Sequence, residues 1–151
     1  MGVGDILFKP QGRIGRKDFW IGWAIMFAAN FLSAIPFVGI VISLGLIYVQ
    51  VCVWGKRLHD MGKTAWLVLV PMLAPLAVIA VGAGLSISMS GGSGAYENAL
   101  FTPVFFIACG LAVILAIGLL VWVGATPGQN GPNAYGPDPR APMAGAAETF
   151  A

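Results

Sequence analysis

The stretch from Phe19 to Trp54, FWIGWAIMFAANFLSAIPFVGIVISLGLIYVQVCVW, contains no Asp, Glu, Lys, Arg or His. A membrane-spanning helix needs about 20 apolar residues, so one helix cannot use the whole run. The helix breakers near its middle are Ser33, Pro36 and Gly39. Proline removes a backbone donor and disfavours helix in the residue before it. The stretch therefore predicts two membrane-spanning helices, over residues 19–35 and 37–54.

Two more apolar runs follow. Residues 65–85 contain Pro71 and Pro75, which we expect to kink a third spanning helix without breaking it, because neighbouring helices can satisfy the freed carbonyls. Residues 101–123 carry no charge and predict a fourth span. The glycines and serines of residues 86–100 indicate a loop, and the prolines and glycines of residues 124–151 indicate an irregular tail.

The composition supports a protein that is solvated mainly by lipid. Of 151 residues, 58% are hydrophobic and only 9% are charged, whereas soluble proteins carry about 25% charged residues. The formal net charge of +2 is too small for the basic face that nucleic-acid binding requires, so no nucleic-acid partner is expected. We predict an all-α, integral membrane four-helix bundle with three parts: an amphipathic N-terminal segment (1–18), a membrane domain (19–123) and a tail (124–151).

The basic residues predict the orientation of this bundle. Four of them precede the first span, three lie between the second and third spans, and one follows the fourth: Lys9, Arg13, Arg16, Lys17, Lys56, Arg57, Lys63 and Arg140. With four spans all eight fall on one side, and Lys and Arg collect on the cytoplasmic side of membrane proteins. Both termini are therefore expected in the cytoplasm. A cleavable signal peptide is the competing interpretation of the N-terminus, but the apolar run is much longer than a signal core.

The segment GRIGRKDFW, residues 12–20, predicts an anchor at the membrane interface. Arg13, Arg16 and Lys17 precede Phe19 and Trp20 at helical spacing. Cations attract anionic lipid head groups, and tryptophan prefers the boundary between hydrocarbon and water. The bilayer with its anionic head groups is thus the first expected partner. Other membrane-protein subunits, or further copies of this chain, are the alternatives.

The segment WGKRLHDMGKTAW, residues 54–66, is expected to be a loop between two spans. It holds the only histidine, His59, next to Asp60. We expect Asp60 to pair with Arg13 or Arg16, because the loop and the N-terminal segment share one membrane face, and we expect the tail to cover this pair. The segment contains no serine or cysteine nucleophile and too few ligands for zinc, so no catalytic, cofactor-binding or metal-binding residue is expected.

A few isolated residues stand out within the spans. Asn30 and Gln50 are the only amides there, and such amides more often link helices than line a pore. Cys52 and Cys109 are expected to lie at different depths, beyond the reach of a disulfide. No ionisable residue lies inside a span, which speaks against most transport mechanisms.

Three segments together resemble a family of bacterial inner-membrane proteins, the domain of unknown function 805. They are GRIGRKDFW, KRLHDMGKTAW and the tail segment PGQNGPNAYGPDP. Lys56, Thr64, Ala65 and Leu67 depart from the family pattern. The resemblance implies a bacterial inner-membrane location and no particular activity. The residues expected to form a structural or partner-contact cluster are Arg13, Arg16, Trp20, Arg57, His59, Asp60, Gly62, Trp66, Asn133, Tyr135 and Asp138.

The sequence favours a non-enzymatic membrane protein, a structural or accessory module whose cytoplasmic face is built from the three segments. A component of small-solute, ion or lipid transport is the alternative, favoured by the two prolines of the third span and by the basic rim. An enzyme that acts at the membrane surface through His59 and Asp60 is a third candidate.

Overall fold

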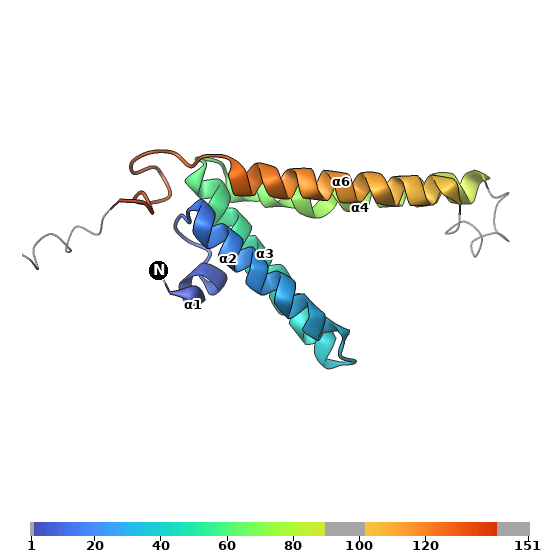
Figure 1. The fold of residues 1–151 in the computed structure, drawn as a ribbon, viewed down its shortest axis with the longest axis horizontal. Coiled ribbons are helices and arrows are strands. Elements are labelled where there is room, and N and C mark those ends of the chain that lie inside the picture. The colour runs from blue at the N-terminus through green and yellow to red at the C-terminus, as the bar shows by residue number, and fades with distance from the viewer. Residues whose placement is uncertain (1, 90–101, 142–151) are drawn as a thin grey trace, which may run out of the picture. The chain divides into compact units, whose positions relative to one another are not determined.

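The computed structural model describes residues 2–89 and 102–141, and it shows an all-α chain, as expected (Figure 1). The described residues contain no strand, only one isolated β-bridge between Asn133 and Gly136. The α-helices are α1 (Val3–Phe8), α2 (Arg16–Asn30), α3 (Val38–Asp60), α4 (Leu69–Met89) and α6 (Pro103–Ala125). Two short 3-10 helices, η1 (Phe31–Ala34) and η2 (Ala65–Val68), precede α3 and α4.

Three helical segments in the described residues are long and apolar enough to cross a membrane. They are Val38–Asp60, Ala65–Met89 and Pro103–Ala125, with mean hydropathies of 2.0, 2.3 and 3.0. The first predicted span, residues 19–35, is not a single α-helix, because α2 has 15 residues and the chain continues as the 3-10 helix η1. At 1.5 Å per residue, α2 is about 22 Å long, less than the roughly 30 Å of a hydrocarbon core. The chain therefore has the helices of a membrane protein, with three clear candidate spans.

The predicted loop at residues 55–64 is wrong in its first half, because α3 continues to Asp60. The helix ends in a Schellman motif, in which the Lys63 amide donates to the Leu58 carbonyl at 2.8 Å and the Gly62 amide to the His59 carbonyl at 3.0 Å. Gly62 has a φ of 71°, which glycine adopts without strain. Lys56 and Arg57 therefore lie on the last turns of a helix. Sequence reasoning placed the end too early because the apolar pattern stops at Trp54.

The turn before α3 lies where the breakers predicted it. Ile35, Pro36 and Phe37 separate η1 from α3, and the Gly39 amide donates to the Ile35 carbonyl at 2.7 Å. A side chain at Gly39 would collide with the Ser33 carbonyl. The close approach of these two backbones requires glycine at this position.

The predicted loop over residues 86–100 is also partly wrong, because α4 extends to Met89. The remainder of that segment lies outside the described residues, as does the end of the tail beyond Ala141. α4 continues through Pro75, while Pro71 lies in its first turn, where a missing amide donor removes no helical hydrogen bond.

The chain divides into two compact units, which we describe separately: Met1–Leu67 with Val123–Ala151, and Val68–Trp122. In the first unit α2 and α3 lie side by side, with α1 packed against both (Figure 1). Gly22 permits this packing, since a Cβ there would lie 3.2 Å from the Val53 methyl groups and 3.3 Å from Ile6. Phe19 is fully buried and meets Trp54 edge to face, with ring centroids 5.5 Å apart.

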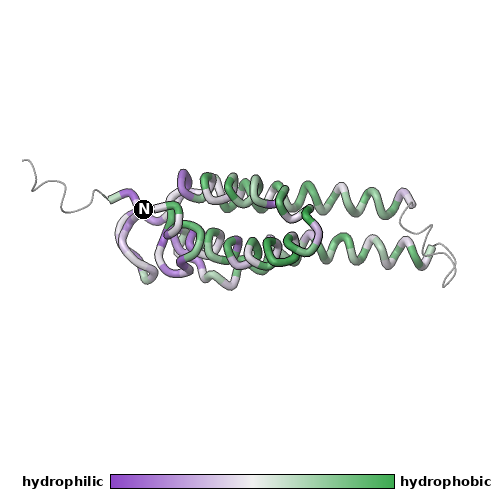
Figure 2. Tube along the Cα trace, turned by 90° about the horizontal axis from the view of Figure 1, so that it is seen from below, coloured by the Kyte–Doolittle hydropathy of each residue, from purple (hydrophilic) through white to green (hydrophobic). Residues whose placement is uncertain are grey.

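The polar residues of the first unit gather near the N-terminus, and most of α2 and α3 is hydrophobic (Figure 2). This end holds the beginning of α2, the end of α3 and the tail. The clustering of polar segments at one end agrees with the three sequence segments expected to form a common face.

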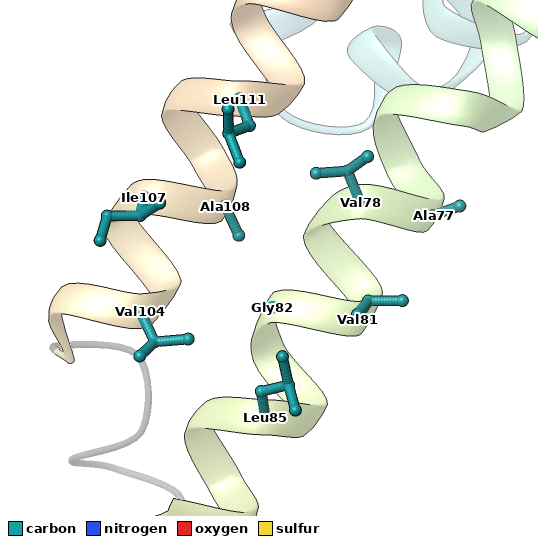
Figure 3. A pocket seen from close by; sticks show the side chains of 9 residues that line it. All are labelled: Ala77, Val78, Val81, Gly82, Leu85, Val104, Ile107, Ala108 and Leu111. Atoms are coloured by element: carbon teal, nitrogen blue, oxygen red, sulfur yellow. The ribbon is translucent and has the colours of Figure 1, made fainter.

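The second unit consists of α4 and most of α6. The helices approach each other closely at Gly82, where a Cβ would collide with Ala108, and the hydroxyls of Ser86 and Thr102 lie 2.6 Å apart. A groove of 400 Å³ runs between the two helices (Figure 3). Every residue that lines it is apolar: Ala77, Val78, Val81, Gly82, Leu85, Val104, Ile107, Ala108 and Leu111.

Candidate functional site

Asp60 lies at the centre of a buried group of charges at the end of α3. Its Oδ1 accepts from Nε and Nη2 of Arg13 at 3.2 and 3.0 Å, and its Oδ2 accepts from Nη1 of Arg57. Arg13 is 3% exposed, Arg57 0% and Asp60 2%. Because charges are costly to bury unless they are paired and hydrogen-bonded, these three side chains form one interdependent unit. We call Arg13, Arg57, His59 and Asp60 the polar cluster.

The guanidinium of Arg13 holds the tail against the end of α3. Besides the Asp60 contacts, it donates to the carbonyls of Gln129 at 2.6 Å, Gly131 at 2.7 Å and Gly136 at 3.3 Å. An arginine side chain has five N–H donors, and Arg13 makes five hydrogen bonds. We call residues 126–140 of the tail the strap.

Arg57 holds the C-terminal end of α6 against the end of α3. Its Nε donates to the Val123 carbonyl at 3.0 Å, and its Nη2 donates to the Thr126 carbonyl. The last carbonyls of a helix lack partners within the helix, and a cation there also interacts favourably with the helix dipole. Arg57 thus supplies the C-terminal cap of α6.

His59 fixes the middle of the strap through its ring and its backbone. The ring stacks on Tyr135 with centroids 3.9 Å apart and planes 5° from parallel, and Nδ1 donates to the Gly12 carbonyl at 3.2 Å. The Asn133 amide donates to the His59 carbonyl at 2.9 Å and to Oε1 of Gln129 at 3.1 Å. The tail therefore covers the Arg13–Asp60 pair, as expected from the sequence.

Two glycines allow the strap to approach α3 this closely. A side chain at Gly128 would collide with the Asp60 carboxylate, and one at Gly62 would collide with the Gln129 amide. The backbone N–H of Gln129 also donates to the backbone carbonyl of Asp60 at 2.8 Å. Gly62 thus has two functions, since it ends α3 and leaves room for the strap.

Asp138 stabilises the strap itself and does not join Asp60. Its carboxylate pairs with Nε of Arg140 at 2.9 Å and accepts from the Gly131 amide at 2.9 Å. The hydrogen bond from the Arg140 side chain is the main reason that the pKa of Asp138 lies well below its ordinary value, and further backbone hydrogen bonds lower it as well. Asp138 therefore remains ionised throughout the physiological pH range.

Three other residues that the sequence predicted for the contact cluster lie at the edge of the polar cluster or outside it. Arg16 does not pair with Asp60 but donates weakly to the Ala125 carbonyl at 3.4 Å. Trp20 meets Phe19 edge to face at 5.6 Å and lies over Gly124. Trp66 is 78% exposed and takes no part in the polar cluster.

Lys56 has a structural role that sequence reasoning missed. It is fully buried, and its Nζ donates to the backbone carbonyls of Asp5 at 2.5 Å and Ile6 at 2.6 Å. These carbonyls belong to α1, so Lys56 holds the N-terminal helix against α3. The sequence shows only that Lys56 is a basic residue directly before Arg57. Such a pair of basic residues is also typical of a solvated loop.

The polar cluster is arranged to hold backbone segments together. Both carboxylate oxygens of Asp60 accept from arginines, and the arginines otherwise point at carbonyl oxygens of the strap and of α6. Within residues 2–89 and 102–141, no three His, Cys, Asp or Glu side chains lie close enough to hold a metal ion. Cys52 and Cys109 are both free thiols.

Comparison with known proteins gives a family without an assigned activity. Residues 7–137 match the family described as "Protein of unknown function (DUF805)". The matched relatives include the "Uncharacterized protein YiiR" of two Escherichia coli strains, each 28% identical over 153 residues, covering 91% of this chain and 90% of the relative. No solved structure matches the chain.

Proposed function

This chain belongs to the DUF805 family, and we propose that it is a non-enzymatic integral protein of the bacterial inner membrane, an accessory module that presents a preassembled polar face to the cytoplasm. This face comprises the polar cluster and the strap. The observation that carries the proposal is the buried Arg13–Asp60–Arg57 group, which binds the N-terminal segment, the end of α3 and the strap to one another.

The contacts of the ionisable side chains support a structural role over a catalytic one. A general acid or base needs a proton or lone pair that can reach a substrate. In the polar cluster the donors of Arg13 and the oxygens of Asp60 contact one another or the backbone, and one face of the His59 ring is covered by Tyr135. Surface catalysis that uses Asp60 would first require its carboxylate to leave Arg13 and Arg57.

The exposed basic residues support contact with anionic head groups. Arg13, Lys56 and Arg57 are buried and hold the fold together, whereas Lys9, Arg16 and Lys17 are exposed. Trp20 and Trp66 are exposed on the same unit, and tryptophan favours the membrane interface. Lys9 pairs with Asp5, so this division leaves Arg16 and Lys17 to meet lipid phosphates, each contact contributing about 1 kcal/mol near an anionic surface.

Transport is the second candidate function. The groove between α4 and α6 favours a lipid as the transported molecule. Because only apolar side chains line this groove, it offers no hydrogen-bond partner to an ion or polar solute. A groove of 400 Å³ with such walls suits part of an acyl chain.

Purification in mild detergent tests the two candidates against each other. An accessory module should copurify with a partner in fixed stoichiometry, and the partner should be lost from an Arg13→Gln variant, whose strap is released, while an Arg16→Gln variant retains it. Arg16 is a suitable control because it is an exposed arginine of the same segment outside the buried pair. Lipid retained without any protein partner would support the lipid-transport alternative and contradict the accessory role.

A further inference from the structure

The strap contains an asparagine that is directly followed by a glycine, Asn130–Gly131, the only such pair in the sequence. Asparagine is a chemically labile residue, and it is most labile before glycine. Glycine has no Cβ that would hinder the attack of its own backbone nitrogen on the preceding side chain. The segment that covers the buried charges therefore carries a candidate site of spontaneous deamidation.

Deamidation at this pair is an intramolecular reaction followed by hydrolysis. The backbone nitrogen of Gly131 attacks Cγ of Asn130, so that an N–Cγ bond forms and the bond from Cγ to Nδ2 breaks. The side-chain nitrogen leaves as ammonia, together with the proton that the Gly131 N–H gives up. Water then opens the cyclic succinimide at either of its carbonyls and yields aspartate or isoaspartate. The reaction consumes only water, so it needs no oxidant, reductant or metal.

The docked strap restrains both groups that must react. The Gly131 N–H donates to Oδ2 of Asp138 at 2.9 Å. This carboxylate stays ionised, and it opposes the negative charge that the nitrogen must acquire before it attacks. Arg13 binds the carbonyls on both sides of Asn130, that of Gln129 at 2.6 Å and that of Gly131 at 2.7 Å. Because ring closure rotates the backbone between these two carbonyls, their contacts with Arg13 resist the reaction.

The isoaspartyl product changes the same contacts. In isoaspartate the main chain runs through the former side chain, which inserts one methylene between Cα of residue 130 and the nitrogen of Gly131. This insertion lies between the two carbonyls that Arg13 binds. One guanidinium with a fixed fork of donors cannot then meet both carbonyls as it does in the docked strap.

We propose that Asn130 is a deamidation site that the docked strap protects, and that its isoaspartyl form releases the strap. Local segments of a folded protein open transiently. Each opening frees the Asn130–Gly131 pair to react, and the product no longer fits the docked position, so a transient opening becomes a lasting one. Arg13, Asp138 and the strap all belong to the first unit. The site therefore does not rest on the proposed function.

Mass spectrometry of the full chain in detergent tests the protection. After timed incubation at neutral pH, the protein is denatured and digested, and isoaspartyl methyltransferase labels the product at Asn130. The wild-type protein should deamidate there more slowly than a synthetic peptide of residues 126–140. Arg13→Gln should accelerate the reaction at least about tenfold, because loss of one partner of a buried ion pair detaches the strap. Arg16→Gln should leave the rate unchanged.

Two further controls keep this test decisive. Asn133 is the internal control, because alanine follows it and its amide is bound to the His59 carbonyl, so it should remain unmodified. Asp138→Ala leaves the buried charges in place, which keeps the chain folded even if Arg13→Gln is not, and it should accelerate the reaction about threefold. Equal rates in wild type and peptide, equal rates at Asn130 and Asn133, or no acceleration in the folded variants would overturn the proposal.

Hydrogen exchange tests the release of the strap. The backbone N–H of Gln129 donates to the Asp60 carbonyl at 2.8 Å, so its protection reports docking. Wild-type protein aged until Asn130 is partly deamidated should lose this protection in the modified fraction. Asn130→Gln, aged in the same way, should keep it, because glutamine would have to form a larger ring. Freshly purified Asn130→Asp should also keep it, since it adds the charge without the methylene. Equal protection in aged wild type and aged Asn130→Gln, or loss of protection in fresh Asn130→Asp, would contradict release by isoaspartate.

Discussion

Asp60 is the residue on which the buried charges depend. It supplies the only carboxylate that contacts Arg13 and Arg57 in the described residues, and both arginines are at most 3% exposed. Removing one partner of a buried ion pair leaves an uncompensated charge, which costs more than the pair itself contributes. The aspartate is therefore more important for stability than a count of its contacts suggests.

We expect Asp60→Asn to lower the free energy of unfolding by about 3 kcal/mol and to expose the strap to proteases. The measurement is denaturant unfolding in detergent, combined with trypsin cleavage after Arg140. Asp138→Asn is the matched control, since Asp138 pairs with the exposed Arg140 and should matter less. A similar loss of unfolding free energy in both variants would contradict this expectation, because it would show that the buried Asp60 pair stabilises the protein no more than the exposed Asp138 pair does.

The pKa of Asp138 predicts how the strap responds to acid. Arg140 holds this pKa below the ordinary value of 3.8, so the pair stabilises the folded strap above pH 3.8, and this stabilisation is lost as the pH falls. The protection of the Gly131 amide from hydrogen exchange, measured relative to the intrinsic rate at each pH, should therefore fall only below about pH 4, because this amide donates to Asp138. Asp138→Asn should abolish this acid response, and an unchanged response would assign it to another group.

At the scale of elements, α2 and α3 depend on a close contact at Gly22. A Cβ there would already lie 3.2 Å from Val53 and 3.3 Å from Ile6, so α1, α2 and α3 meet at this glycine. Gly22→Leu should destabilise the protein by about 2 kcal/mol, the typical cost of overpacking. Thermal unfolding in detergent measures this effect.

Gly45 provides the control for this substitution. It lies within α3, and a Cβ at this position would have nothing within 4 Å of it. Gly45→Leu should therefore not lower the unfolding temperature, because leucine favours helix over glycine. Equal destabilisation by both substitutions would indicate that helix propensity, and not packing at Gly22, controls the result.

The end of α3 shows why the boundaries of elements were harder to predict than their existence. The apolar run predicted a helix that ends at Trp54, because the charged residues Lys56 and Arg57 are typical of a solvated loop. In the folded chain these side chains find backbone carbonyls of α1, α6 and the strap. Partners distant in sequence thus allow six more residues to remain helical, up to Asp60.

For the whole molecule, the distribution of charge predicts orientation. All eight lysines and arginines lie in segments that four spans would place on one side of the membrane. We expect reporter fusions after Gly94 and after Arg140 to report opposite compartments, with Arg140 in the cytoplasm. Because α2 is short for a span, this experiment also tests whether α2 and η1 together cross the membrane. Fusions that report the same side would contradict four spans.

The sequence by itself determined the all-α class, the apolar helices and the residues that would gather at one end. These properties follow from local composition, since long uncharged runs must be helical in lipid. It also predicted that Asp60 pairs with an arginine of the N-terminal segment, because that segment and the predicted loop were expected near the same membrane surface. Only the tertiary structure selected Arg13 over Arg16, buried Lys56 beneath α1, and left Trp66 exposed. These outcomes depend on which backbone carbonyls lie within reach of a side chain, and that follows from how the helices pack.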